Sequence, residues 1–204
     1  MQHGNFVGVY PSARDRVSVL KELGLDPTRP VVASLGELRS YKGLDVARAA
    51  FDRLGGAVQW VVAGQPHEDT RLLLGGLAPS QAVVLARRLS EQEFSDIASA
   101  ADLMWLPYHR FTGSSVVLAA LTFGTAVVAS DLPFFRDVLE HDGPAGHLVP
   151  VGDARALAGA TLALLKMPRD MRRAAALAVA GQFDWQRTVA PVAAVFTRWL
   201  EESR

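Results

Sequence analysis

Short apolar runs recur along the chain and alternate with segments of helical periodicity. Each run is almost continuously apolar, which is typical of a strand that is covered on both faces of a sheet. Strands and helices that alternate in this way predict a doubly wound parallel sheet, an α/β fold of the Rossmann-like kind. The runs are VVASLG (31–36), VQWVVAG (58–64), VVLA (83–86), LMWLP (103–107), AVVAS (126–130) and HLVP (147–150).

The intervening segments carry the start and stop signals of helices. SEQE at 90–93 is a capping box, in which Ser and Glu side chains bond the free N–H groups of a helix start. Asp153 is placed to cap another helix, and Gly124 follows an almost wholly apolar one as a C-terminal glycine would. The predicted helices span residues 14–23, 44–54, 67–74, 90–100, 116–123, 131–139, 153–166, 169–180 and 185–202, of which the last three form a C-terminal helical tail.

One turn lies where a ligand would reach it, between the fourth strand and the apolar helix that follows. It reads Thr112-Gly113-Ser114-Ser115. A turn at this place presents free backbone N–H groups and the positive end of a helix dipole, which suits a phosphate. Gly113 leaves the backbone open to a ligand, and the two serines add hydroxyl donors. Taken alone, the motif fits an ordinary N-cap better, so the prediction depends on what else reaches this edge.

Composition narrows the classes of protein that fit. The chain has 204 residues, half of them hydrophobic, enough for one domain with a full core. Basic and acidic residues number 21 each, which argues against a general nucleic-acid or membrane-surface binder. The absence of cysteine excludes disulfides and thiolate metal sites, and the histidines show no metal-binding spacing. No apolar run approaches the roughly 20 residues that span a bilayer and no signal peptide is evident, so we expect a cytoplasmic protein.

Cationic side chains gather in the loops after the predicted strands, with Glu37 as the only acid among them. In a doubly wound sheet these loops share one edge, where ligands bind. Cations beside a helix N-terminus suit a di- or polyanionic ligand, although each residue singly would be an ordinary surface charge. The cations are Arg39 and Lys42 after the first strand, Arg87 and Arg88 after the third, and His109 and Arg110 after the fourth.

The common nucleotide and nucleophile signatures are missing. There is no GxxxxGK[ST] and no GxGxxG after the first strand, which excludes P-loop chemistry and disfavours a dinucleotide site. There is no GxSxG elbow, and Asp45, Asp131 and Asp137 have no spacing that suggests a metal. A flavodoxin- or receiver-like signalling domain fits poorly because the chain is too long.

In combination, these segments resemble the C-terminal, donor-binding domain of group 1 glycosyltransferases, which are retaining enzymes of family 4 with the GT-B fold. LGELRSYKGLDV (35–46) is similar to the family's G-x-x-R-x-x-K-G turn. TGSSVVLAALTFGTAVVASDLP (112–133) is similar to the segment that ends in its G-x-P-V-V-A-S strand. GHLVPVGDARALA (146–158) is similar to the G-x-L-V-x-x-G-D block. With HGNFVGVYP as lead-in and FDWQRTV as tail helix, the resemblance runs from His3 to about Leu200.

The resemblance implies roles for individual residues. Arg39 and Lys42 would contact the donor diphosphate and act as the catalytic cations, because neutralising the leaving phosphate is itself catalysis. The Thr112–Ser115 turn would supply backbone and hydroxyl donors to the phosphates, and Arg88 and Leu89 would border the nucleobase. Such sites use no metal and no other cofactor, and a nucleotide diphosphate sugar is the donor substrate.

The chain departs from the family at two glutamates. Many relatives carry an E-x7-E pair that contacts the sugar and the ribose, where this chain has Phe111 and Ala119. A subset of the family has TGSG-like sequences in place of these acids, often with an R-x-Y-K-G turn as here, so the loss is not proof of inactivity. The alternative hypothesis is a degenerate, non-catalytic module of the same fold that binds nucleotide or a protein partner.

The resemblance also predicts the organisation of the protein. Residues 1–24 would be a linker and lead-in helix, residues 25–180 the nucleotide-sugar-binding domain, and residues 181–204 a C-terminal helix that packs toward an N-terminal acceptor domain. We expect a fragment of a two-domain enzyme of hexosyltransferase type, inactive alone, with the full-length enzyme cytoplasmic or peripheral to the membrane. Surface meant for the missing domain would carry apolar side chains that favour self-association of the isolated chain, namely Phe6, Val9, Tyr10, Val195 and Trp199.

Overall fold

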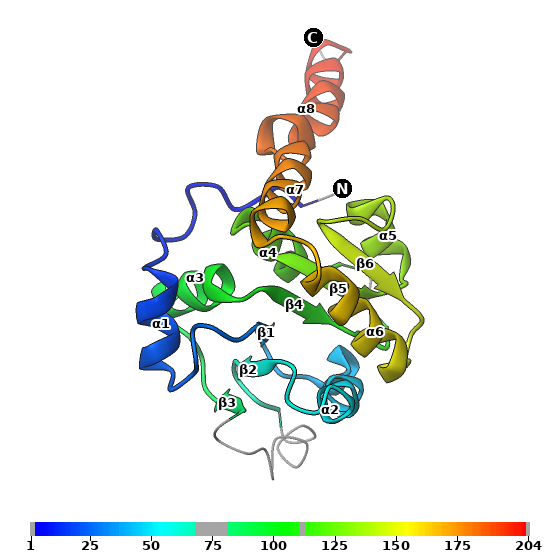
Figure 1. Ribbon diagram of the computed structural model, residues 1–204. Helices are drawn as coiled ribbons and strands as arrows, with labels where there is room; N and C mark the ends of the chain where they lie inside the picture. The colour runs from blue at the N-terminus through cyan, green and yellow to red at the C-terminus, as the bar shows by residue number, and fades with distance from the viewer. Residues whose placement is uncertain (1–2, 68–80, 111–112, 203–204) are drawn as a thin grey trace.

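The structure, a computed structural model, describes residues 3–67, 81–110 and 113–202, and Figure 1 shows a central sheet with helices around it. The strands pair in parallel in the order β3-β2-β1-β4-β5-β6. The predicted doubly wound parallel sheet is therefore confirmed. Its strands are β1 (Val31–Leu35), β2 (Gln59–Ala63), β3 (Ala82–Leu85), β4 (Leu103–Leu106), β5 (Ala126–Ser130) and β6 (Gly146–Val149).

Helices fill the connections between the strands, and each described helix begins and ends within two residues of its predicted bounds. The capping box is present, because the Ser90 hydroxyl accepts from the Glu93 N–H and the Glu93 carboxylate accepts from the Ser90 N–H. Most of the predicted helix at 67–74 lies outside the described residues. The helices are α1 (Arg16–Glu22), α2 (Leu44–Arg53), α3 (Glu91–Ala100), α4 (Ser115–Thr122), α5 (Pro133–Leu139), α6 (Ala154–Leu165), α7 (Arg169–Gln182) and α8 (Trp185–Glu202), with a 3-10 turn at Ser40–Lys42.

Side chains alternate across the sheet and build one core on each face. On one face, Val32, Trp60 and Trp105 pack with residues of α2 and α6. On the other, Ala33 and Met104 pack with residues of α1, α3, α4 and α7. Because both faces are covered, apolar residues are needed at nearly every strand position, which is the cause of the continuous runs in the sequence.

The strand order reverses between β1 and β4, which lie side by side in the middle of the sheet. Val32 pairs with Leu103, and Ala33 with Met104. In an open α/β sheet, the loops after two such strands diverge to opposite faces and leave a crevice at the carboxyl edge. The loops after β1 and β4 are those that hold the R-x-x-K-G turn and the TGSS turn, so the topology brings both motifs to one edge.

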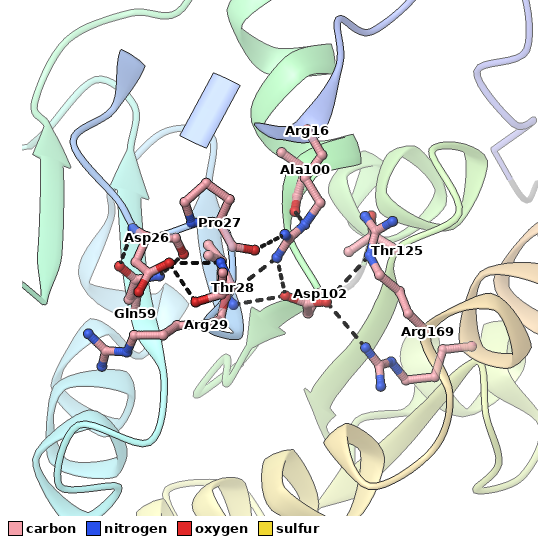
Figure 2. A network of polar contacts seen from close by, with 12 residues as sticks. Arg16, Asp26, Pro27, Thr28, Arg29, Gln59, Ala100, Asp102, Thr125 and Arg169 are labelled. Atoms are coloured by element: carbon pink, nitrogen blue, oxygen red, sulfur yellow. Dashed lines mark hydrogen bonds and ion pairs between the residues drawn. The ribbon is translucent and has the colours of Figure 1, made fainter. Parts of the chain in front are cut away.

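One buried carboxylate joins several elements at the opposite, amino edge of the sheet. Asp102 precedes β4 and accepts a hydrogen bond of 2.9 Å from the N–H of Val31, at the start of β1. Figure 2 shows Arg16 of α1 and Arg169 of α7 approaching this carboxylate from two sides, at 2.9 and 3.4 Å. Arg172 of α7 lies 3.3 Å from it. The network fastens α1 and α7 to the two central strands.

The N-terminal segment is held at the junction of α7 and α8. The Asn5 N–H donates to the carbonyl of Phe183 at 2.7 Å, and the Trp185 indole N–H donates to the carbonyl of Asn5 at 2.9 Å. Beyond this junction, α8 points away from the sheet (Figure 1). Within the described residues, no helix is long and apolar enough to cross a membrane.

Candidate functional site

The loop after β1 folds back over the end of its own strand. Gly36 has φ +94°, a conformation that residues with a side chain rarely adopt. A Cβ atom on Gly36 would lie 3.0 Å from Nζ of Lys42, six residues later. The glycine therefore leaves the space into which the lysine ammonium returns, at the carboxyl end of β1.

Lys42 is a partly buried cation at this edge. Its Nζ lies 5.8 Å from the centroid of the Tyr108 ring, and it forms no salt bridge with the described residues. Burial lowers the pKa of Lys42 to about 8, while Glu37 acts in the opposite direction. An ammonium group that has lost part of its hydration without gaining a carboxylate partner is suited to bind an anion.

The first turn of α4 adds backbone donors to the same edge. Ser114 is the N-cap, but its side chain makes no capping hydrogen bond and lies 3.4 Å from the Tyr108 hydroxyl. The space beside Gly113 is open, since a Cβ atom there would meet no other atom within 4 Å. Among the described residues, no acceptor takes the first N–H groups of this eight-residue helix, so these groups can receive an anion.

A cavity of about 800 Å³ lies beside these groups. It extends from Gly36 and the start of α4 to Arg88 and Leu89. A second hollow of about 290 Å³ shares several lining residues with it and includes Lys42 and Ala119. The larger volume is within the range of about 300–1,000 Å³ that is common for small-molecule sites.

The structure brings part of the predicted site together. Lys42, Arg88, Leu89 and Ser115 line these two hollows, so the loops after β1, β3 and β4 do meet. Gly113 and Ser114 of the predicted turn precede Ser115 but line neither hollow. Thr112 of the same turn lies outside the described residues, as does Phe111.

Other predicted cations are already paired. The Arg39 guanidinium donates to the Glu37 carboxylate at 2.8 Å, and Arg39 lines neither hollow. Arg87 makes a forked pair with Glu93, at 2.6 and 3.0 Å. The same glutamate thus serves the capping box and neutralises one of the arginines that the sequence assigned to the carboxyl edge.

Two acids from helix starts join Glu37, which is the only acid in the loops where the cations gather. Glu91 lines the larger cavity, and Asp45 lies 2.8 Å from the imidazole of His109. Both acids come from the first turns of helices, where the dipole favours a carboxylate, whereas the sequence argument counted only the loops. Arg110 is exposed and does not line the two hollows.

Two aromatic side chains form a wall of the larger cavity. The sequence analysis did not assign either of them to the site. Tyr10 and Phe94 both line it, and their rings stack with centroids 5.1 Å apart. The sequence predicts that Tyr10 belongs to a surface meant for another domain. In the structure Tyr10 is half-buried, and its ring centroid lies 5.7 Å from that of Phe123. In the sequence, Tyr10 stands in the apolar segment FVGVY (6–10), which has no periodicity. Such a segment does not reveal where in the fold its side chains lie.

Comparison with known sequences identifies one family whose model matches most of the chain. The family described as "Glycosyl transferases group 1" matches residues 16–178. The chain is 43% identical over 146 residues to phosphatidyl-myo-inositol mannosyltransferase of Mycobacterium leprae, which covers 68% of this chain and 37% of that protein. It is 31% identical over 199 residues to D-inositol 3-phosphate glycosyltransferase of Mycobacterium avium, covering 92% and 46%. The chain thus spans less than half the length of these relatives.

Solved structures share the fold at low sequence identity. The Anabaena protein Alr3699/HepE, in complex with UDP and glucose, matches with a TM-score of 0.78 and 18% identity over 96% of this chain and 55% of its own. Sucrose-phosphate synthase from Thermosynechococcus elongatus matches with a TM-score of 0.71 and 18% identity, over 95% of this chain and 52% of its own. The sheet and its flanking helices are therefore those of known GT-B structures.

Proposed function

Because the chain belongs to the group 1 glycosyltransferases, we propose that it is the donor-binding half of a retaining hexosyltransferase, which moves a sugar from a nucleotide diphosphate sugar to an acceptor. The observation that carries the proposal is the ammonium of Lys42, partly buried, without a salt bridge to the described residues, and beside the open start of α4. The UDP and glucose bound to Alr3699/HepE support a nucleotide-sugar donor.

The diphosphate would lie between Lys42 and the first N–H groups of α4. As the bond between the sugar and the diphosphate breaks, negative charge grows on the departing phosphate, and fixed donors at this place lower the barrier. Arg39 would join them by leaving Glu37. Both side chains of that pair are about half exposed, and such surface pairs contribute only about 0–1 kcal/mol, so the exchange costs little.

The nucleobase would occupy the cavity of about 800 Å³. Arg88 and Leu89 line this cavity, and so do the stacked rings of Tyr10 and Phe94. We propose that the cationic side chains neutralise the donor without a metal ion, which is tested by repeating each titration with Mg²⁺ and with a chelator. Loss of binding in the chelator would contradict this part of the proposal.

A second candidate function is a non-catalytic nucleotide-binding or partner-binding module. Ala119, at a position where many relatives have a glutamate, is 2% exposed and lines the smaller hollow. No carboxylate therefore reaches the sugar or ribose from this position of α4. A longer protein containing this chain that binds nucleotide but transfers no sugar from UDP-, GDP-, ADP- or dTDP-activated donors would favour the module.

The proposed organisation is a two-domain, cytoplasmic or membrane-peripheral enzyme. Residues 25–180 would bind the donor, residues 1–24 and 181–204 would connect to an acceptor domain, and the chain alone would transfer no sugar. Joining the chain to the acceptor half of a relative and recovering transfer would support this arrangement.

The direct experiment is calorimetric titration of the chain with UDP, GDP, ADP and dTDP. We expect binding of one nucleotide, weakened strongly in Lys42→Ala and less in Arg39→Ala, with Lys21→Ala as the matched control because Lys21 is an exposed lysine on α1. Binding that is unchanged in Lys42→Ala, or no binding of any nucleotide by the folded chain, would contradict the proposed site.

A further inference from the structure

The two loops that build the donor edge are packed into one unit. The backbone N–H of His109 donates to the carbonyl of Tyr41 at 2.8 Å. The imidazole Nε2 of His109 lies 2.8 Å from the Asp45 carboxylate, at the start of α2. The loop after β4 is therefore fastened on both sides of the lysine turn, to the residue before Lys42 and to the helix after it.

A close backbone approach adds to these bonds. Gly43 has φ +69°, and a Cβ atom on it would overlap the carbonyl oxygen of Pro107. The turn after Lys42 thus rests directly on the chain that leaves β4, with no room for a side chain between them.

Tyr108 lies at the centre of this unit and is 2% exposed. Its ring meets the ring of Tyr41 edge-on at 5.8 Å and the ring of Phe135 at 5.4 Å. One side of the ring carries the ammonium of Lys42, at 5.8 Å from the centroid, and its hydroxyl reaches to within 3.4 Å of the Ser114 hydroxyl. A single side chain therefore contacts both phosphate-binding elements. It lines neither the 800 Å³ nor the 290 Å³ hollow.

We propose that Tyr108 is a positioning residue of the donor site: its ring holds the Lys42 ammonium and its hydroxyl holds Ser114, so that the lysine and the start of α4 keep one spacing. The inference rests on the proposed function for its ligand, but the contacts themselves do not depend on it. Tyr108 acts through its two neighbours, because it does not reach the space where the diphosphate would lie. Burial raises the pKa of Tyr108, so the hydroxyl keeps its proton in neutral solution.

A tyrosine that merely fills the core would predict a different outcome. Replacement by another apolar side chain would then lower stability without changing Lys42 or the preference for a particular phosphate. The variants that separate these cases are Tyr108→Phe, which keeps the ring and removes the hydroxyl, and Tyr108→Leu, which removes both. Tyr108→Met is the substitute if Tyr108→Leu does not fold.

The first test needs no nucleotide. The chain has three lysines, Lys21, Lys42 and Lys166, so acylation by an amine-reactive reagent can be followed for each by mass spectrometry. Two charged groups on the same loop, Glu37 and Arg39, act on Lys42, and all variants keep both of them. From the side of β4, the ammonium of Lys42 faces the ring of Tyr108.

We expect half-maximal labelling of Lys42 near pH 8 in the wild-type chain and in Tyr108→Phe. In Tyr108→Leu, the pH of half-maximal labelling moves upward, toward the ordinary value for lysine, because the ammonium is no longer held beside the ring and can turn out into water. Lys21 and Lys166 serve as internal controls and stay unchanged. A Lys42 profile that is the same in all three proteins overturns the proposal.

The second test compares nucleoside diphosphate with nucleoside monophosphate, for the base that the chain binds. In Tyr108→Leu we expect the affinity for the diphosphate to fall by about tenfold or more, and that for the monophosphate to change far less. Tyr108→Phe gives a smaller loss, which reports the contact with Ser114. Combining Tyr108→Leu with Lys42→Ala adds to Lys42→Ala only about the loss seen in Tyr108→Phe, because the rest of the effect of Tyr108 acts through Lys42.

Equal losses for both nucleotides, or fully additive losses in the double variant, overturn the positioning role. If the wild-type chain binds no nucleotide, the proposed function fails, and the labelling experiment still decides whether Tyr108 holds Lys42. The two failures are thereby distinguishable.

Discussion

The positive charge of Lys42 lowers the stability of the folded chain. Its pKa is about 8 in the folded chain, against 10.5 for an ordinary lysine, so folding disfavours the charged form. The penalty is fully present below about pH 8 and disappears as the pH rises toward 10.5. A site that keeps an unfavourable charge is typical of function rather than of stability.

We therefore expect Lys42→Met to stabilise the chain while it strongly weakens nucleotide binding. The free energy of unfolding at pH 7 should rise by on the order of 1–3 kcal/mol, and the gain should shrink as the pH is raised toward 10. Urea unfolding at several pH values measures this, with Lys21→Met as a control that stays within about 0.5 kcal/mol of the wild type. A destabilised Lys42→Met at pH 7 would show that the ammonium has a structural partner.

Nucleotide affinity should depend on the same proton. Only the charged ammonium attracts a diphosphate, so the affinity of the wild-type chain should fall as the pH rises through about 8. In Lys42→Met, the weaker residual affinity should be level over this range. Titrations between about pH 7 and pH 9 decide the point, and a parallel decline in both proteins would assign the proton to another group.

At the scale of elements, the carboxyl edge depends on how closely the lysine turn rests on the chain after β4. Gly43 and Gly24 have nearly the same backbone conformation, with φ +69° and +73°. A Cβ atom on Gly24 meets nothing within 4 Å, whereas one on Gly43 would overlap the carbonyl of Pro107. The pair therefore separates the conformational cost of an alanine from the cost of moving two loops apart.

We expect Gly24→Ala to lower the free energy of unfolding by about 1 kcal/mol, the cost of a side chain in the left-handed region. Gly43→Ala should cost clearly more and should also weaken nucleotide binding, because Lys42 moves with the turn. Thermal unfolding and titration of both variants test this. Equal stability losses in the two variants would mean that the loops separate without strain.

The amino edge depends instead on Asp102, whose side chain is 8% exposed and lies near three arginines. Asp102→Asn keeps an acceptor for the Val31 N–H and removes the charge, leaving the buried Arg172 without its counter-ion. We expect a loss of about 3–5 kcal/mol in the free energy of unfolding. Asp52→Asn, which breaks an exposed pair with Arg48 on α2, should cost less than about 0.5 kcal/mol. A similar small loss for both would show that water reaches the Asp102 network.

The elements themselves were predictable because each has a local cause. Burial on both faces gives the apolar strand runs, and the Ser90–Glu93 box marks the start of α3 without reference to the rest of the chain. The charge balance of the site was not predictable, since Glu93 reads as a cap and only the fold shows that it also holds Arg87. Tyr108 lies in the loop after the predicted strand at 103–107, and its contacts with Lys42 and Ser114 depend on tertiary structure alone.

At the scale of the whole molecule, the N-terminal segment and α8 lie outside the sheet and the helices that cover it. The segment lies over the donor edge, where Tyr10 lines the cavity, and it is tied to the start of α8 through Asn5 and Trp185. A change in the direction of α8 would therefore shift the N-terminal segment and, with it, the Tyr10 side chain that lines the cavity. The site is thus linked to the part of the chain that extends from the domain.

The exposed face of α8 has the pattern of a helix that pairs with another helix. Five of its apolar residues recur at alternating intervals of four and three, which places them in one stripe along the helix. All of them are at least one third exposed, and two reach 61%. An apolar stripe of this kind in water favours association. The stripe consists of Trp185, Val189, Val192, Phe196 and Trp199.

We expect the isolated chain to self-associate through this stripe. Sedimentation velocity over about a hundredfold range of concentration should show an average mass that rises with concentration, as mass action requires. Phe196→Glu combined with Trp199→Glu should leave a monomer, because charges in the stripe would have to be buried in the pair. Ala190→Glu combined with Ala194→Glu adds the same charge to the opposite face of α8 and should leave association unchanged. A wild-type chain that stays monomeric at the highest concentration, or equal effects of the two double variants, would contradict an interface on this face.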